Sequence, residues 1–301
     1  MLNNNLHLVS NENTTAIDPM IDPEGFNQYL DHRRDQITQQ CIDQMKMVYD
    51  QTVNFSNNLD AAKGLALLGD PGIGKTVQVE NALKDSKASV EYKKASTMSA
   101  IGFYYALFYN RQPHRILVLD DFDLIHHTQA VHIMSMLKTA TENIYKPRVV
   151  IWDKQPTPYM IEHNIPNQFE YWGNIIWITN ESPESIMKKP KLRQHMGALV
   201  GPDGRFRPIV LNWTKEQKYL WTIHLIKKEG ILGINCMKKK GGYSQEIQDA
   251  VVEFLKKEYQ NLVSISPRGA CNIADDMLNF PDSWKEKTLS LNVFAWQGEQ
   301  K

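Results

Sequence analysis

The chain has little cysteine, no excess of either charge and no long apolar run. Its three cysteines, Cys41, Cys236 and Cys271, do not have metal-ligand spacing, so we expect reduced thiols rather than a disulfide scaffold or a zinc site. The 34 basic residues balance the 34 acidic residues, so bulk charge does not attract nucleic acid. No apolar run reaches the roughly 18 residues of a membrane span, and the N-terminus has no signal-peptide pattern. These absences predict a cytoplasmic protein without a membrane partner.

The most informative stretch that is present is rich in glycine. Residues 69–76 read GDPGIGKT and match G-x-x-x-x-G-K-[ST], between an apolar run at 65–68 and an expected helix at 77–83. Glycines let the backbone curl so that N–H groups converge on phosphates, and the amino terminus of the helix adds positive potential. Lys75 would reach the β- and γ-phosphates, and the Thr76 hydroxyl would hold Mg²⁺. The residues expected to hold the nucleotide are Gly69, Asp70, Pro71, Gly72, Ile73, Gly74, Lys75, Thr76 and Val77.

A second motif indicates hydrolysis of the nucleotide. The apolar run 116–119 is typical of a buried parallel strand, and it ends in Asp120 and Asp121. Asp120 would hold the Mg²⁺ shell through water, and Asp121 would orient or deprotonate the attacking water. A turn or a helix cap is the alternative interpretation of such a pair. The spacing from Lys75 leaves room for a helix, a strand and a second helix, which favours the hydrolytic role.

A third apolar strand over 174–179 ends in Asn180. An amide at the end of a neighbouring strand can reach the γ-phosphate or the attacking water. The alternative is that Asn180 simply begins a turn.

The order of these motifs resembles the AAA+ ATPases, in which a phosphate loop, a Walker B strand and a sensor 1 asparagine follow one another. Downstream, Ser266 and Pro267 form a helix start that places Arg268 at the sensor 2 position. The resemblance covers residues 53–285. It implies ATP and Mg²⁺ as ligands and an α/β P-loop core with a central parallel sheet at 53–212. An all-α lid would follow at 213–301, and a tail with a helix would precede the core at 1–52.

The resemblance also implies a homo-oligomer, most simply a hexameric ring or spiral, because AAA+ sites are completed by an arginine from the neighbouring subunit. That arginine usually precedes the last core strand. Arg205 fits best, followed by Arg207 and Arg193, and solvated surface charges are the alternative. The implied catalytic residues are therefore Asp121, Asn180, Arg205 and Arg268.

Asp121 departs from the family, which usually has glutamate there. Paired aspartates also occur in superfamily-3 viral helicases, so a replication helicase stays an alternative. A nucleotide-dependent switch or scaffold with incidental hydrolysis is a second alternative.

The residue sequences of 120–123, 166–173 and 266–268 are similar to those of AAA+ proteins of tailed phages and mobile elements. This similarity implies a role in the DNA metabolism of a phage or mobile element in the host cytoplasm. Loading or remodelling of protein or protein–DNA complexes in DNA replication is one such role. The sequence assigns no functional role to Asp123, and a helix cap is the default interpretation of this residue.

Other segments give weaker expectations. The asparagine-rich opening, residues 1–15, is expected to be disordered, and a helix is expected from Pro23 to about Gln51. A strand over 149–154 and the polar stretch to residue 167 suggest a hairpin that either presents residues to a substrate or is an inert arm. Lysines 238–240 are either a solvated loop tip or a contact to nucleic acid. Three lid helices are expected, capped by Thr214, Ser244 and Ser266.

Overall fold

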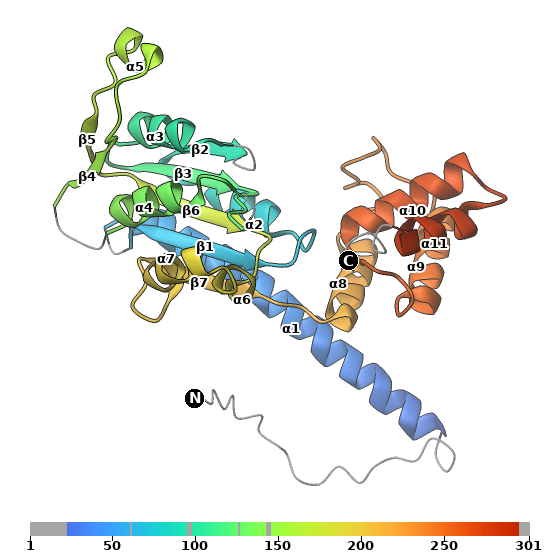
Figure 1. Cartoon of the computed structure of the whole chain (residues 1–301). Helices are drawn as coiled ribbons and strands as arrows, with labels where there is room; N and C mark the ends of the chain where they lie inside the picture. Colours follow the sequence, from blue (N-terminus) through green and yellow to red (C-terminus); the bar gives the residue numbers. More distant parts are fainter. Residues whose placement is uncertain (1–22, 61, 95–97, 126, 143–145, 295–301) are drawn as a thin grey trace.

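The structure is a computed structural model, and it describes residues 23–60, 62–94, 98–125, 127–142 and 146–294 (Figure 1). Residues 1–15, for which the sequence predicts disorder, lie outside the described residues. Within the described ranges, the helices are too short or too polar to cross a membrane.

A parallel sheet of five strands forms the centre of the described chain, in the order β2-β3-β6-β1-β7. Strands β1 and β6 are buried along their whole length because helices cover both faces of the sheet, which explains their uninterrupted apolar sequences. All strands end at the same edge, so the loops that follow them meet there. The strands are β1 (Gly64–Gly69), β2 (Ser89–Lys94), β3 (Arg115–Asp120), β6 (Asn174–Thr179) and β7 (Phe206–Leu211).

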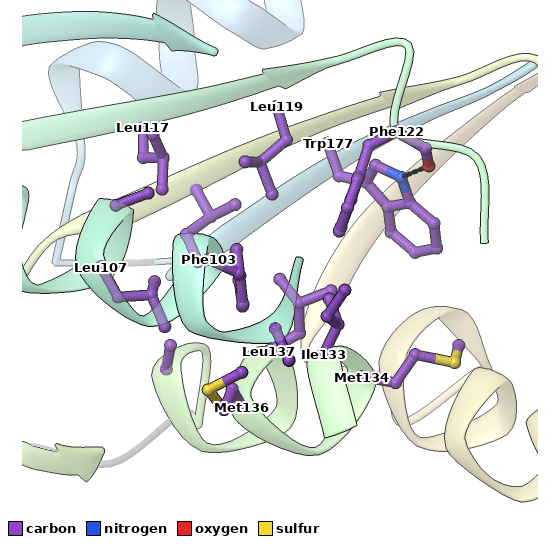
Figure 2. Packing of buried hydrophobic residues seen from close by; sticks show 14 of the residues in the cluster. Phe103, Leu107, Leu117, Leu119, Phe122, Ile133, Met134, Met136, Leu137 and Trp177 are labelled. Carbon is purple, nitrogen blue, oxygen red and sulfur yellow. Dashed lines mark hydrogen bonds between the residues drawn. The ribbon is translucent and has the colours of Figure 1, made fainter. Parts of the chain in front are cut away.

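Alternate side chains of the central strands enter two separate cores. Leu117 and Leu119 of β3 pack with Trp177 of β6 against the helices α3 (Ala100–Tyr109) and α4 (Ala130–Ala140), as Figure 2 shows. The short helix α6 (Pro183–Met187) and α7 (Pro190–Val200) also follow on this side, with Ile186, Leu192 and Leu199 in the same core. Ile116 and Val118 point to the other face, where α2 (Lys75–Leu83) and the long helix α1 lie.

Helix α1 (Pro23–Asn57) ends six residues beyond the expected Gln51. Cys41, Met45 and Val48 are fully buried or nearly so, whereas Ile37 and Leu30, earlier on the same stripe, are only half-buried. The carboxyl half of α1 is therefore part of the core, and its amino half extends past the core toward α8 (Figure 1).

An antiparallel arm interrupts the chain before β6. Strand β4 (Arg148–Ile151) pairs with β5 (Gln168–Tyr171), and α5 (Pro158–Glu162) lies at the tip of the arm (Figure 1). The expected hairpin is present, but its first strand ends at Ile151 rather than at residue 154. Arg148 is 2% exposed and donates from Nε and Nη2 to the carbonyl oxygens of Tyr171 and Gly173, at 3.0 and 2.8 Å. These bonds attach the root of the arm to the segment that leads into β6.

The C-terminal part is all helical and has a core of its own. Its helices are α8 (Lys215–Lys228), α9 (Gln245–Glu258), α10 (Pro267–Asn279) and α11 (Trp284–Phe294). Thr214 and Gln217 form the expected capping box, and Ser244 and Ser266 accept hydrogen bonds as caps of α9 and α10. Helix α11 is one more than the three helices that the sequence predicts. The α/β class with a parallel sheet followed by a helical part is confirmed.

Candidate nucleotide site

The glycine-rich loop connects β1 to α2 at the carboxyl edge of the sheet. Gly72 and Gly74 have φ angles of 76° and 105°, a region that side-chain-bearing residues rarely adopt. The loop therefore needs glycine at these positions to turn back over the amino terminus of α2, which begins at Lys75.

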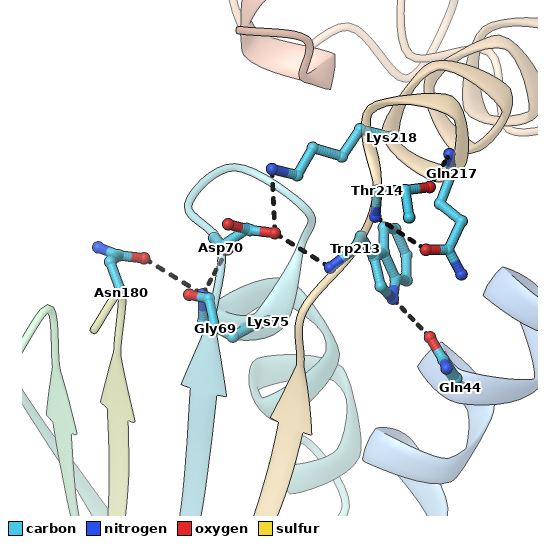
Figure 3. A network of polar contacts seen from close by, with 9 residues as sticks. All are labelled: Gln44, Gly69, Asp70, Lys75, Asn180, Trp213, Thr214, Gln217 and Lys218. Atoms are coloured by element: carbon cyan, nitrogen blue, oxygen red, sulfur yellow. Dashed lines mark hydrogen bonds and ion pairs between the residues drawn. The ribbon is translucent and has the colours of Figure 1, made fainter. Parts of the chain in front are cut away.

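Lys75 lies under this loop and is 5% exposed. Its Nζ donates to the carbonyl oxygens of Gly69 (2.7 Å) and Asp70 (2.6 Å) and to Oδ1 of Asn180 (3.2 Å), as Figure 3 shows. Burial lowers the pKa of Lys75 to about 8, although the carboxylates of Asp70, Asp123, Asp121 and Asp120 oppose that shift. The ammonium group is thus desolvated among acceptors that an anionic phosphate could replace.

Thr76 and Asp120 meet at the end of β3. The Thr76 hydroxyl donates to Oδ1 of Asp120 at 2.8 Å. A hydroxyl and a carboxylate are hard oxygen donors, the type that Mg²⁺ prefers, and Mg²⁺ keeps most of its other ligands from water and phosphates. The donor set therefore fits the expected cation.

Asp121 and Asn180 face each other across the ends of β3 and β6. Asn180 Nδ2 donates to Asp121 Oδ1 at 3.1 Å while its Oδ1 accepts from Lys75, so the amide bridges the lysine and the second acid. Asp121 is exposed and has a φ angle of 52°. The carboxylate is therefore accessible to water beside the phosphate loop.

Asp123 has a contact that differs from its expected role. Its Oδ1 accepts from the Thr179 hydroxyl (2.6 Å) and from the backbone N–H of Asn180 (3.0 Å). The following helix, α4, has Gln129 as its N-cap residue. The interpretation of Asp123 as a helix cap is wrong, because the carboxylate crosses to the neighbouring strand instead.

The loop is also tied to α8. Asp70 Oδ2 accepts from the Trp213 backbone N–H (3.1 Å) and from Lys218 Nζ (2.9 Å), as Figure 3 shows. Trp221 donates from Nε1 to the Ile73 carbonyl oxygen at 3.0 Å. Sequence reasoning missed Lys218 and Trp221, since they belong to no motif and meet the loop only through the fold.

Arg268 lies in the first turn of α10. A Cβ atom added to Gly72 would lie 2.9 Å from the Cβ of Ser266, so the amino end of α10 adjoins the phosphate loop of the same chain. Arg268 itself is exposed. It follows Ser266, the residue that adjoins the loop, by two positions.

Two of the other candidate arginines, Arg205 and Arg207, lie away from the loop. Arg205 directly precedes β7, and the first residue of β7, Phe206, pairs with Gly64 at the start of β1, so Arg205 is at the edge opposite to the phosphate loop. Its Nη1 donates to the Ala198 carbonyl oxygen at 3.3 Å. Arg193 donates to the Met187 carbonyl oxygen at 3.1 Å, and Arg207 is exposed on β7. Of the expected residues, the structure therefore brings together Lys75, Thr76, Asp120, Asp121 and Asn180 and separates Arg205 and Arg207 from them.

Comparison with known proteins gives one relative by sequence. No family model matches the chain. An uncharacterized 36.7 kDa protein of Enterobacteria phage T4, from the nrdC-mobD intergenic region, is 28% identical over 231 residues. The match covers 74% of this chain and 66% of the phage protein, just under two thirds of its length. This similarity confirms the predicted resemblance to phage proteins.

Among solved structures, the chain is similar to RuvB of Thermotoga maritima, a Holliday junction branch migration motor. The TM-score is 0.44 at 11% identity, over 84% of this chain and 69% of the motor. A mutant of the same protein gives a TM-score of 0.43 at 10% identity over the same shares. The chain is thus similar in sequence to a phage protein and in structure to a branch migration motor.

Proposed function

We propose that this chain is an ATPase of the AAA+ type that couples hydrolysis of ATP to remodelling or loading of protein or protein–nucleic-acid complexes. One observation carries the proposal: Lys75, Thr76, Asp120, Asp121 and Asn180 converge at the carboxyl edge of one parallel sheet. Ligands of open α/β sheets bind at that edge. Residues 53–212 would be the ATPase core and 213–301 the lid.

The roles follow from the chemistry of each group. Lys75 would leave its carbonyl partners and neutralise the β- and γ-phosphates, while the loop N–H groups between Gly69 and Val77 cradle them. Thr76 and Asp120 would hold Mg²⁺, which stabilises charge on the transferring phosphoryl group. Asp121 would accept the proton of the attacking water, and Asn180 would orient that water. Aspartate is one methylene shorter than glutamate, so the water must approach the strand end more closely.

Oligomerisation is part of the proposal. Arg205 cannot reach the loop of its own subunit from the opposite edge of the sheet, so its use in catalysis requires a neighbour. We propose a hexameric ring or spiral in which Arg205 contacts the γ-phosphate in the adjacent subunit, with Arg207 and Arg193 as the next candidates. We further propose a role in phage DNA metabolism in the host cytoplasm, without a membrane partner. The similarity to a phage protein supports the phage part of this proposal.

Two other functions remain candidates. A superfamily-3 helicase is less favoured, because the helix that carries Arg268 adjoins the loop as a lid would, and that family normally lacks such a lid. A switch or scaffold with incidental hydrolysis is favoured only by Asp121 in place of glutamate. Steady-state ATPase rates distinguish these functions when they are measured with single-stranded DNA, with double-stranded DNA and without DNA. Strong stimulation by single-stranded DNA together with strand separation would favour the helicase.

Affinity for Mg·ATP should fall above about pH 8. Burial lowers the pKa of Lys75 to about 8, and only its charged form binds phosphate, so the charged form is present below that pH and is lost above it. Phosphate binding favours the charged form, so binding near pH 8 should take up a proton, with affinity falling by up to about tenfold per pH unit above it. Calorimetry at pH 7, 8 and 9 in buffers of different ionisation enthalpy measures both effects. Equal affinity at pH 7 and 9 with no proton uptake would contradict this account.

Mixing inactive variants should separate a trans arginine from a cis arginine. A Lys75→Ala subunit still offers Arg205 to a neighbour, and an Arg205→Ala subunit still binds ATP, so their mixture should recover part of the ATPase activity. A mixture of Lys75→Ala and Arg268→Ala subunits should not, because both lesions damage the subunit's own site. Each arginine substitution removes a charge-assisted contact that strengthens in the transition state. Equal behaviour of the two mixtures would mean that at least one arginine is misassigned.

A further inference from the structure

The loops that carry Asp121 and Asn180 are joined by more than the sheet. Main-chain pairing of β3 with β6 runs only as far as Leu119 and Trp177. Beyond it, the Phe122 N–H donates to the Ile178 carbonyl oxygen at 3.0 Å, and Trp177 Nε1 donates to the Phe122 carbonyl oxygen at 2.9 Å (Figure 2). Contact between the two chain segments therefore continues past the last paired residues of the strands.

Two carboxylates extend this contact in opposite directions. Asp123, after β3, accepts from the Thr179 hydroxyl at 2.6 Å and from the Asn180 N–H at 3.0 Å, both through Oδ1. Glu181, after β6, accepts from the Leu124 N–H (2.7 Å) through Oε2 and from the Ile125 N–H (2.5 Å) through Oε1. We call this reciprocal pair, Asp123 and Glu181 with their four donors, the carboxylate clasp.

The surroundings of the carboxylate clasp make its hydrogen bonds strong. Glu181 is 9% exposed and Asp123 is half-buried, so their bonds to N–H and O–H groups are charge-assisted and only partly screened by water. Asp121 lies two residues before Asp123 and has a left-handed backbone, which is unfavourable for a side-chain-bearing residue unless the surroundings impose it. Asn180 is itself one of the clasped residues.

We propose that Asp123 and Glu181 are positioning residues that hold Asp121 and Asn180 face to face for hydrolysis. The proposal rests on the proposed ATPase function and adds two residues to that site. Asp123 acts through Asn180, whose backbone it holds, and Glu181 acts through the loop that follows Asp121. Loosening either loop would move the acid or the amide relative to the attacking water, and a displacement of about 1 Å can cost about 100-fold in rate.

Asp123 and Glu181 differ in the number of carboxylate oxygens that accept hydrogen bonds, and this difference allows a test. Asp123 receives both donors on one oxygen, so Asp123→Asn keeps an acceptor for both of them. Glu181 receives its donors on two oxygens, so Glu181→Gln offers a carbonyl oxygen to one N–H and an NH₂ group to the other. Conservative replacement should therefore be tolerated at position 123 and not at position 181.

The experiment measures kcat for ATP and the Kd of Mg·ATP for Asp123→Asn, Asp123→Ala and Glu181→Gln, with Asp85→Asn as an exposed control. We expect Asp123→Ala and Glu181→Gln to lose about 10- to 100-fold in kcat with Kd nearly unchanged. Asp123→Asn should stay within about threefold of wild type, since it keeps the contact geometry. Hydrogen exchange should be faster at the Asn180 amide in Asp123→Ala and at the Leu124 and Ile125 amides in Glu181→Gln.

Two results would overturn the proposal. If Asp123→Asn is as inactive as Asp123→Ala, the charge of Asp123 takes part in the chemistry. Unchanged kcat and unchanged exchange in Asp123→Ala would mean that the clasp holds nothing in place. A wild-type protein that does not hydrolyse ATP would refute the proposed function instead, and the exchange measurement would still decide whether the clasp orders the two loops.

Discussion

Replacing Lys75 with alanine is expected to abolish ATP binding at micromolar concentration while the chain stays folded. The ammonium group is the buried cation of the phosphate loop, and its partners in the free protein are two loop carbonyl oxygens and Asn180. Hydrogen bonds to charged groups contribute about 1.5–3 kcal/mol each, so losing the contacts to two phosphates should weaken binding about 100-fold or more. Titration with a fluorescent ATP analogue measures the affinity, and circular dichroism reports the fold.

Lys84→Ala is the matched control for this variant. Lys84 follows the last residue of α2, is exposed and contacts Asn81, so its removal should leave nucleotide affinity unchanged. Unaltered affinity in Lys75→Ala would make the assignment of the phosphate loop wrong.

Asp121→Asn should keep Mg·ATP bound and slow its hydrolysis by about two to four orders of magnitude, the usual contribution of a general base. Asparagine retains an oxygen that can accept from Asn180 Nδ2, so the variant removes the proton acceptor while the contact between the two loops stays possible. Single-turnover phosphate release, together with the Kd of Mg·ATP, separates the two effects.

Asp121→Glu tests the same residue by keeping the carboxylate and lengthening the side chain. It supplies the carboxylate that AAA+ proteins usually have at this position, so it should hydrolyse ATP far faster than Asp121→Asn. If Asp121→Asn turns over at the wild-type rate, the catalytic carboxylate lies elsewhere.

The parts of the site that the sequence predicts are those set by local pattern. The glycine spacing before Lys75 requires a turn that only glycine adopts readily, and the apolar runs before Asp120 and Asn180 mark strands buried on both faces. Because parallel strands end at one edge, the three motifs could be placed together before their contacts were known. The caps of α8, α9 and α10 are equally local and equally predictable.

The remaining contacts depend on how distant segments pack. Asp123 and Glu181 each bond to the segment at the end of the neighbouring strand, so a pattern read along one segment assigns Asp123 a cap and Glu181 no role. Lys218 reaches Asp70 only because α8 folds back beside the phosphate loop. The sequence suggests the hairpin that begins with β4 but not its second strand, β5, since that strand lies beyond α5 in the chain.

Arg205 is a different case, because its proposed contact lies in another subunit. In one chain it donates to the Ala198 carbonyl oxygen at the edge of the sheet opposite to the phosphate loop. A role as a trans arginine would require this side chain to turn outward on assembly. The mixing experiment tests that requirement without knowledge of the assembled structure.

Phosphate release from ATP shows whether the converging residues form an ATP-hydrolysing site. The wild-type protein, Lys75→Ala and Asp121→Asn are compared with Mg²⁺ and with excess chelator. We expect Mg²⁺-dependent release by the wild type that is lost in Lys75→Ala and strongly reduced in Asp121→Asn. Equal release by all three proteins, or release that the chelator does not affect, would contradict it.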